Sequence, residues 1–185
     1  MINGSGGVGS ILVQLARQLT GLTVIATASR PDRVEWVKKM GAHHVVDYTR
    51  PLDEELVRIG FPRVDYVASL TATDHYLPLF PKIVSAQGHI ALIDDPKSLD
   101  IVPLKRKAIS VSWEFMFTRS MFQTDDMGEQ RVLLNAVSRL VEEGRIASTV
   151  TRRLSPIDAA TLKEAHRIVE TGSSMGKLVV EGFPA

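Results

Sequence analysis

Cysteine is absent from this sequence of 185 residues, and neither sign of charge is in excess. The absence of cysteine excludes disulfide bonds, a thiolate nucleophile and a thiolate-bound zinc site. With 22 Lys and Arg against 21 Asp and Glu, the formal net charge is +1, so no basic field attracts nucleic acid. No apolar run reaches the ~18 residues of a membrane span, and no segment resembles a signal peptide. We therefore expect a cytoplasmic protein whose partners are small molecules or a second copy of the chain.

Metal-binding patterns are missing as well. The five histidines include no His-Glu-x-x-His arrangement. The two adjacent ones, His43 and His44, would point to opposite faces of a strand. We expect no zinc and no other metal ion.

Helical and strand patterns alternate along most of the chain. Apolar residues recur at helical spacing from Val8 to Leu19, and the β-branched run at residues 22–28 follows as a buried strand. Short connections join the later segments. Further strands are expected at residues 44–47, 64–69, 88–93 and 109–115, with helices at 31–41, 52–59, 73–84 and 127–143. Alternation of this kind predicts an α/β fold with a doubly wound parallel sheet of the Rossmann type.

The composition changes near residues 144–149, where we place a domain boundary. Residues 1–147 form the expected dinucleotide-binding domain, and its first strand, at Met1 and Ile2, is cut short. Residues 148–185 carry a strand at 149–154, a helix after Pro156 and a strand at 177–181. We interpret this tail as the remnant of a second, catalytic domain.

A glycine-rich turn opens the first helix and satisfies the pattern G-x-G-x-x-G. Gly4 would allow a tight turn, Gly6 a close approach of backbone to a pyrophosphate, and Gly9 close helix–strand packing. The helix that begins near Val8 would direct free N–H groups at the phosphates. A glycine loop without a ligand is the alternative, but the strand–turn–helix context favours dinucleotide binding by these residues, Gly7 included.

The end of the second strand indicates which dinucleotide binds. An NAD site places a carboxylate there, whereas this sequence has Ser29 and Arg30, followed by Arg33. Each charge-assisted hydrogen bond to a 2′-phosphate contributes about 1.5–3 kcal/mol, roughly a ten- to hundredfold preference. Asp32 is interpreted as a residue of the first helical turn. We predict NADPH as the cofactor; the alternative is that the arginines are solvated surface charges.

Several segments resemble the medium-chain dehydrogenase/reductases. The glycine-rich turn, Val24-Ile-Ala-Thr-Ala-Ser29, Val45-Val-Asp-Tyr48 and Gly176-Lys-Leu-Val-Val180 occur in the order found in that family. Residues 113–119 make the sequence most similar to the zinc-independent, quinone-oxidoreductase-like branch, often named zinc-type alcohol dehydrogenase-like. The resemblance covers nearly the whole chain.

The resemblance implies a set of cofactor contacts and an oligomer. It places Arg33 and Tyr48 in the pocket of the adenosine phosphate. The ends of the fourth and fifth strands would flank the cofactor, and the segment after the sixth would run beside the nicotinamide. These implied residues are Leu70, Thr71, Ile93, Asp94, Phe115, Met116 and Phe117. Members of the family are commonly dimers, which would pair residues 110–115 across a twofold axis.

The implied reaction is hydride transfer from NADPH to a quinone or a conjugated carbonyl. Family members carry an N-terminal barrel-like domain that this sequence lacks, so we expect NADPH binding without turnover by this chain alone. No catalytic proton donor can be assigned, and a catalytically silent NADPH-binding or redox-sensing module is the alternative. The apolar cluster from Trp113 to Phe122 either walls a substrate site or belongs to the core or a dimer interface.

Overall fold

The computed structural model describes residues 1–183. All the strand pairs within it are parallel. A two-stranded sheet contains β1 and β2, a three-stranded sheet has the order β3-β4-β5, and a third sheet pairs β6 with β7. The strands are β1 (Ile25–Thr27), β2 (His44–Val46), β3 (Val64–Ser69), β4 (Val84–Leu92), β5 (Ser110–Trp113), β6 (Val150–Leu154) and β7 (Lys177–Val180).

The first residues of the chain join the sheet of β1 and β2 to the sheet of β3, β4 and β5. The Met1 nitrogen donates to the carbonyl of Ile25, 2.9 Å away, and the Ile2 N–H donates to the carbonyl of Ala68, also at 2.9 Å. The spatial order is therefore β2-β1-(residues 1–3)-β3-β4-β5, with all members parallel. This is the strand order of a Rossmann sheet, and the expected doubly wound fold is confirmed.

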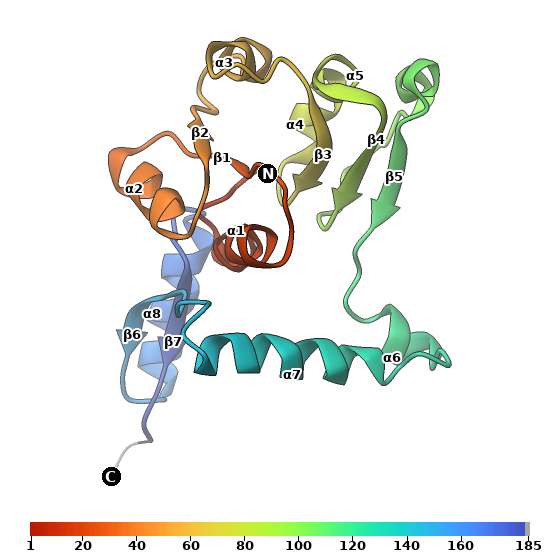
Figure 1. Cartoon of the computed structure of the whole chain (residues 1–185). Helices are drawn as coiled ribbons and strands as arrows, with labels where there is room; N and C mark the ends of the chain where they lie inside the picture. Colours follow the sequence, from red (N-terminus) through yellow and green to blue (C-terminus); the bar gives the residue numbers. More distant parts are fainter. Residues whose placement is uncertain (184–185) are drawn as a thin grey trace.

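Helices within residues 1–107 lie beside the strands of this sheet, and the later helices lie away from it (Figure 1). The helices are α1 (Gly7–Leu19), α2 (Pro31–Lys39), α3 (Leu52–Arg58), α4 (Thr73–Tyr76), η1 (Leu77–Leu79), α5 (Phe80–Ile83), η2 (Val102–Lys107), α6 (Thr118–Phe122), α7 (Glu129–Glu142) and α8 (Ala159–Glu170). Two apolar clusters form the core. One surrounds Phe80 and Ile90 near β3 and β4, and the other surrounds Val13 and Val37 between α1 and α2.

The helix expected at residues 73–84 is broken into α4, η1 and α5. Pro78 and Pro81 lack the N–H that would continue a helical ladder, and each stands at the start of a new short segment. β4 begins at Val84, four residues before its expected start, and passes Gly88. A Cβ on Gly88 would lie 2.8 Å from the carbonyl oxygen of Asp65, so glycine permits this close approach of β4 to β3.

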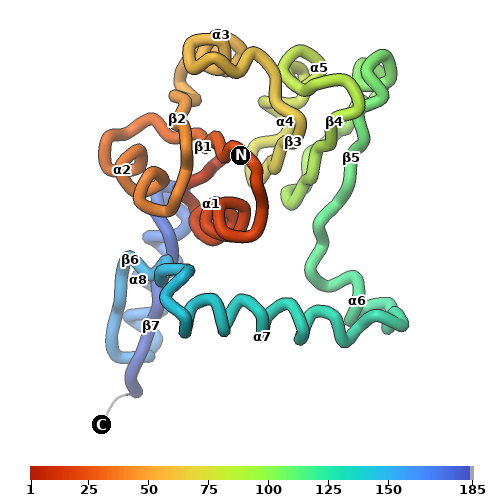
Figure 2. The backbone as a smooth tube through the Cα atoms, in the orientation of Figure 1, coloured from red at the N-terminus to blue at the C-terminus, as the bar shows by residue number. Residues whose placement is uncertain are grey.

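The C-terminal part lies beside α1 and α2 and is reached through α7, which runs below the sheet (Figures 1 and 2). The Gln14 amide of α1 fixes the connection after α7. Its Oε1 accepts from the Ala147 N–H at 2.8 Å and its Nε2 donates to the Ala147 carbonyl at 3.1 Å. No helix within residues 1–183 is long and apolar enough to cross a membrane.

Candidate dinucleotide-binding site

The glycine turn (residues 3–9) is built on close backbone contacts. Its left-handed residue is Asn3, with φ 60°, and not one of its glycines. A Cβ on Gly9 would lie 2.2 Å from the Asn3 carbonyl oxygen, and a Cβ on Gly4 would lie 2.7 Å from the Cβ of Ala26. Gly9 thus allows α1 to lie close to the backbone of the turn itself, at Asn3 and Gly4, where we had expected a close contact with a strand. Gly4, by contrast, is required by its contact with β1 and not by the tight turn that we expected.

The N-terminus of α1 is presented by this turn. Gly7 is the first helical residue, Gly6 is the N-cap without a side-chain hydrogen bond, and the first turn contains no acidic residue. The N–H groups of a first helical turn have no partner inside the helix and carry a partial positive charge. Gly6 to Gly9, including the half-exposed Val8, therefore form a cradle that suits a pyrophosphate.

A buried serine fixes the turn to α2. The Ser10 hydroxyl donates to the Gly6 carbonyl at 2.7 Å and accepts from the Trp36 indole N–H at 2.8 Å. The two contacts hold the turn at a defined distance from α2. Sequence reasoning did not identify Ser10 or Trp36, because their 26-residue separation has no local pattern.

The basic residues after β1 differ in their surroundings. Arg30 is exposed and paired with Asp32 at 3.0 Å. Arg33 is only 8% exposed, and its Nη2 donates to the carbonyl of Ser173 at 2.6 Å. Its Nε is buried without a hydrogen-bond partner, and no carboxylate among residues 1–183 lies within 4 Å of its guanidinium. A buried cation without a counterion is costly, which makes this position suited to an anionic ligand.

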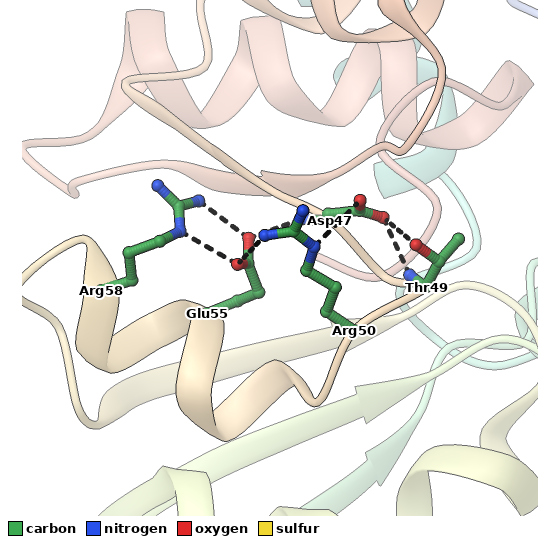
Figure 3. Close-up of polar contacts among 5 residues, drawn as sticks. All are labelled: Asp47, Thr49, Arg50, Glu55 and Arg58. Atoms are coloured by element: carbon green, nitrogen blue, oxygen red, sulfur yellow. Dashed lines mark hydrogen bonds and ion pairs between the residues drawn. The ribbon is translucent and has the colours of Figure 1, made fainter.

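The loop after β2 is held by charged side chains (Figure 3). The buried Glu55 carboxylate accepts from Arg58 at 2.7 and 2.9 Å and from the Asp47 N–H at 3.0 Å. The hydrogen bonds from Arg58, then the one from Asp47, lower the pKa of Glu55 to about 2. Asp47 in turn accepts from the Thr49 N–H and hydroxyl. The network fixes the loop that carries Tyr48, whose side chain is 36% exposed.

The ends of β3 and β4 lie together, as the predicted cofactor contacts require. Ser69 is paired with Leu92, so Leu70 and Thr71 follow β3 at the same edge where Ile93 and Asp94 follow β4. The Asp94 carboxylate is engaged in the structure. It accepts from the Thr73 N–H at 2.9 Å and from the Thr73 hydroxyl, and so joins the end of β4 to the start of α4.

The aromatic segment after β5 is exposed. Trp113, Phe115, Met116, Phe117, Met121 and Phe122 are each at least 50% exposed. The rings of Phe115 and Phe117 stack edge to face with centroids 5.5 Å apart. The expectation that these residues belong to a core is wrong for residues 1–183.

Two cavities lie near the sheet. The larger, about 580 Å³, lies between β1 and β3 at the end opposite the glycine cradle, with Val24 on one side and Tyr66 on the other. Ligands of open α/β sheets bind at the carboxyl ends of the strands, so we do not assign the cofactor to it. The second, about 440 Å³, includes Ser29 and Asp47, which follow β1 and β2. Within residues 1–183 no three His, Asp or Glu side chains form a group that could hold a metal ion.

The parallel sheet, its glycine cradle and the helix that starts there define a Rossmann domain of the dinucleotide-binding class. The chain belongs to the family described as zinc-binding dehydrogenase, whose pattern matches residues 40–180. It is thus a member of the medium-chain dehydrogenase/reductases, as the sequence resemblance implied.

Known proteins support this assignment over part of their length. A zinc-type alcohol dehydrogenase-like protein of Staphylococcus epidermidis is 38% identical over 181 residues, which are 97% of this chain and 54% of that protein. A solved structure from Rhizobium etli, described as a zinc-dependent alcohol dehydrogenase protein, is 55% identical with a TM-score of 0.96, and the match covers 100% of this chain and 54% of that one. An NADPH-dependent alkenal/one oxidoreductase of Arabidopsis thaliana is 24% identical over 184 residues, covering 100% of this chain and 40% of the relative. The chain therefore spans about half the length of the Staphylococcus and Rhizobium relatives.

Proposed function

We propose that this chain is the NADPH-binding portion of an oxidoreductase that transfers a hydride to a quinone or a conjugated carbonyl. The observation that carries the choice of NADPH is Arg33, a buried guanidinium without a carboxylate partner. Among residues 1–183, the carboxylate that follows β1 is Asp32, and its pairing with Arg30 competes with a ribose hydroxyl. The name of the Arabidopsis relative supports the same cofactor and a conjugated carbonyl substrate.

The residues of the chain would bind and orient the cofactor. The cradle of α1 holds the pyrophosphate, and Ser29 and Arg33 hold the 2′-phosphate. The rigid loop after β2 presents Tyr48 to the adenosine end. The bound cofactor supplies the hydride, while the protein fixes its position and excludes water around it. The exposed segment from Phe115 to Phe117 would cover the nicotinamide end, and no residue is assigned as proton donor.

Dissociation constants for NADPH and NADH test this proposal. The wild-type chain should bind NADPH about ten- to a hundredfold more tightly, the effect of one charge-assisted hydrogen bond. Arg33→Gln and Ser29→Ala should weaken NADPH binding and leave NADH binding nearly unchanged. Arg139→Gln, on an exposed part of α7, is the matched control and should change neither. Equal affinities of the wild-type chain for the two dinucleotides would overturn the choice of NADPH.

Turnover and assembly are tested separately. We propose that the 185-residue chain binds NADPH without reducing quinones; rapid reduction of a quinone would contradict this. We also propose a homodimer through β5, because β5 is an edge strand of its sheet and the Trp113 that ends it is exposed. Sedimentation should give a dimer for the wild type and a monomer for Trp113→Lys. A cytoplasmic location is likewise a proposal.

A further inference from the structure

The side chain of Lys177 lies on the glycine cradle, although it comes from the far end of the chain. A Cβ on Gly7 would lie 2.6 Å from the Cε and 2.7 Å from the Nζ of Lys177. The backbone next to it is fixed as well, since the Gly176 N–H donates to the Ser5 carbonyl at 2.9 Å. β7 therefore begins beside the cradle and places an ammonium group over the first residue of α1.

The charges at this point are unbalanced. The N-terminus of α1 carries a partial positive charge, and its first turn contains no acidic residue. The Lys177 ammonium has no ion pair with any carboxylate of residues 1–183 within 4 Å. A cation beside a helix N-terminus is repelled unless an anion lies with them. The N-terminus of α1 and the Lys177 ammonium therefore repel each other, and an anionic ligand bound between them would stabilise both.

A second cation without a carboxylate partner, Arg33 of α2, contacts the residues just before Lys177. Arg33 is buried, its Nε has no partner, and its guanidinium donates to Ser173, four residues before Lys177. The segment 173–177 thus contacts both the helix that would bind the 2′-phosphate and the turn that would bind the pyrophosphate. Arg33 and Lys177 therefore both involve this one stretch of the C-terminal part.

We propose that Lys177 is a ligand of the cofactor pyrophosphate and that the segment 173–177 is a wall of the cofactor site. This inference rests on the proposed function, because it takes the dinucleotide as the anion. It differs from the role given to Arg33 in a way that can be measured. The pyrophosphate is common to NADPH and NADH, whereas the 2′-phosphate belongs to NADPH alone.

The test compares Lys177→Gln and Lys177→Arg with Lys163→Gln. Lys163 is exposed on α8 and has no ion pair with a carboxylate of residues 1–183. Lys177→Gln should raise the dissociation constants of NADPH and NADH by a similar factor, about ten to a hundred. The ratio of the two constants should stay at the wild-type value. Lys177→Arg should retain most of the affinity, and Lys163→Gln all of it.

Stability measurements separate binding from folding. Thermal unfolding without cofactor should show Lys177→Gln to be at least as stable as wild type, because the substitution removes a repulsion in the free chain. Wild-type dissociation constants in Lys177→Gln would overturn the inference, and so would an effect confined to NADPH. A variant that loses affinity in proportion to a lower unfolding temperature would also overturn it. If the proposal of NADPH is wrong, the wild-type chain will bind NADPH and NADH equally, which is a different result from any of these.

Discussion

Replacing Gly9 by alanine should disturb both stability and cofactor binding. The added Cβ would lie 2.2 Å from the Asn3 carbonyl oxygen and 2.7 Å from the Cα and carbonyl carbon of Gly4. All three are backbone atoms, so no side-chain rotation relieves the overlap and the turn must move away from α1. Overpacking of this kind typically costs about 1–3 kcal/mol. The higher helix propensity of alanine offsets about 1 kcal/mol, so we expect a net loss of up to about 2 kcal/mol.

Urea unfolding followed by circular dichroism measures this loss, and fluorescence titration measures NADPH binding. Binding should weaken at least tenfold, because the displaced N–H groups no longer converge on the pyrophosphate. Gly21→Ala is the control: its Cβ would meet no atom within 4 Å, and the unfolding free energy should change by less than about 0.5 kcal/mol. A Gly9→Ala chain with wild-type stability and affinity would refute the reasoning that close backbone packing shapes the cradle.

Three further substitutions test contacts around the site. Glu55→Gln should lower the unfolding free energy by about 1–3 kcal/mol at pH 7. The pKa of Glu55 is about 2 in the folded chain, against an ordinary value of 4.5. The difference in unfolding free energy between wild type and Glu55→Gln should therefore be complete above pH 5 and vanish as the pH falls toward 2. Urea unfolding at the two ends of this pH range measures it. Asp94→Asn removes the charged acceptor of Thr73 and should cost about 1–2 kcal/mol in thermal unfolding; an unchanged midpoint would contradict the assigned contact. Gln14→Leu should speed hydrogen exchange at Ala147 above that of the wild type, and equal rates would show that the paired hydrogen bonds do not hold the connection.

The local sequence pattern predicted helices and strands well where no long-range contact or proline alters them. β3 has the expected bounds, residues 64–69. The helix expected to stop at Gly41 ends at Lys39, and Gly41 follows with φ 106°. α6 was not expected, because residues 118–122 lack a helical apolar pattern and the segment lies exposed. The expected helix at 73–84 is broken at Pro78 and Pro81, because the two prolines interrupt the helical hydrogen bonds that the apolar pattern alone predicts.

The site was less predictable than the fold. The glycine motif located the cradle, because its spacing carries the geometry of a turn and a helix start. The burial of Arg33 could not be foreseen, since its partner Ser173 is 140 residues away in the sequence. The position of Lys177 could not be foreseen either, because only the fold brings β7 next to Gly7. Contacts of this range have no periodicity that a sequence pattern could reveal.

Because Lys177 and Arg33 differ in exposure, their contributions to cofactor binding should depend differently on ionic strength. Mobile ions at 0.15 M screen charges over about 8 Å of solvent, but they screen buried groups much less. Lys177 is exposed, so its attraction for a phosphate should fade as salt is added. Arg33 is 8% exposed and is covered by the loop of Ser173, so its attraction should persist. Discrimination between the two dinucleotides should therefore survive concentrations of potassium chloride that weaken the binding of both.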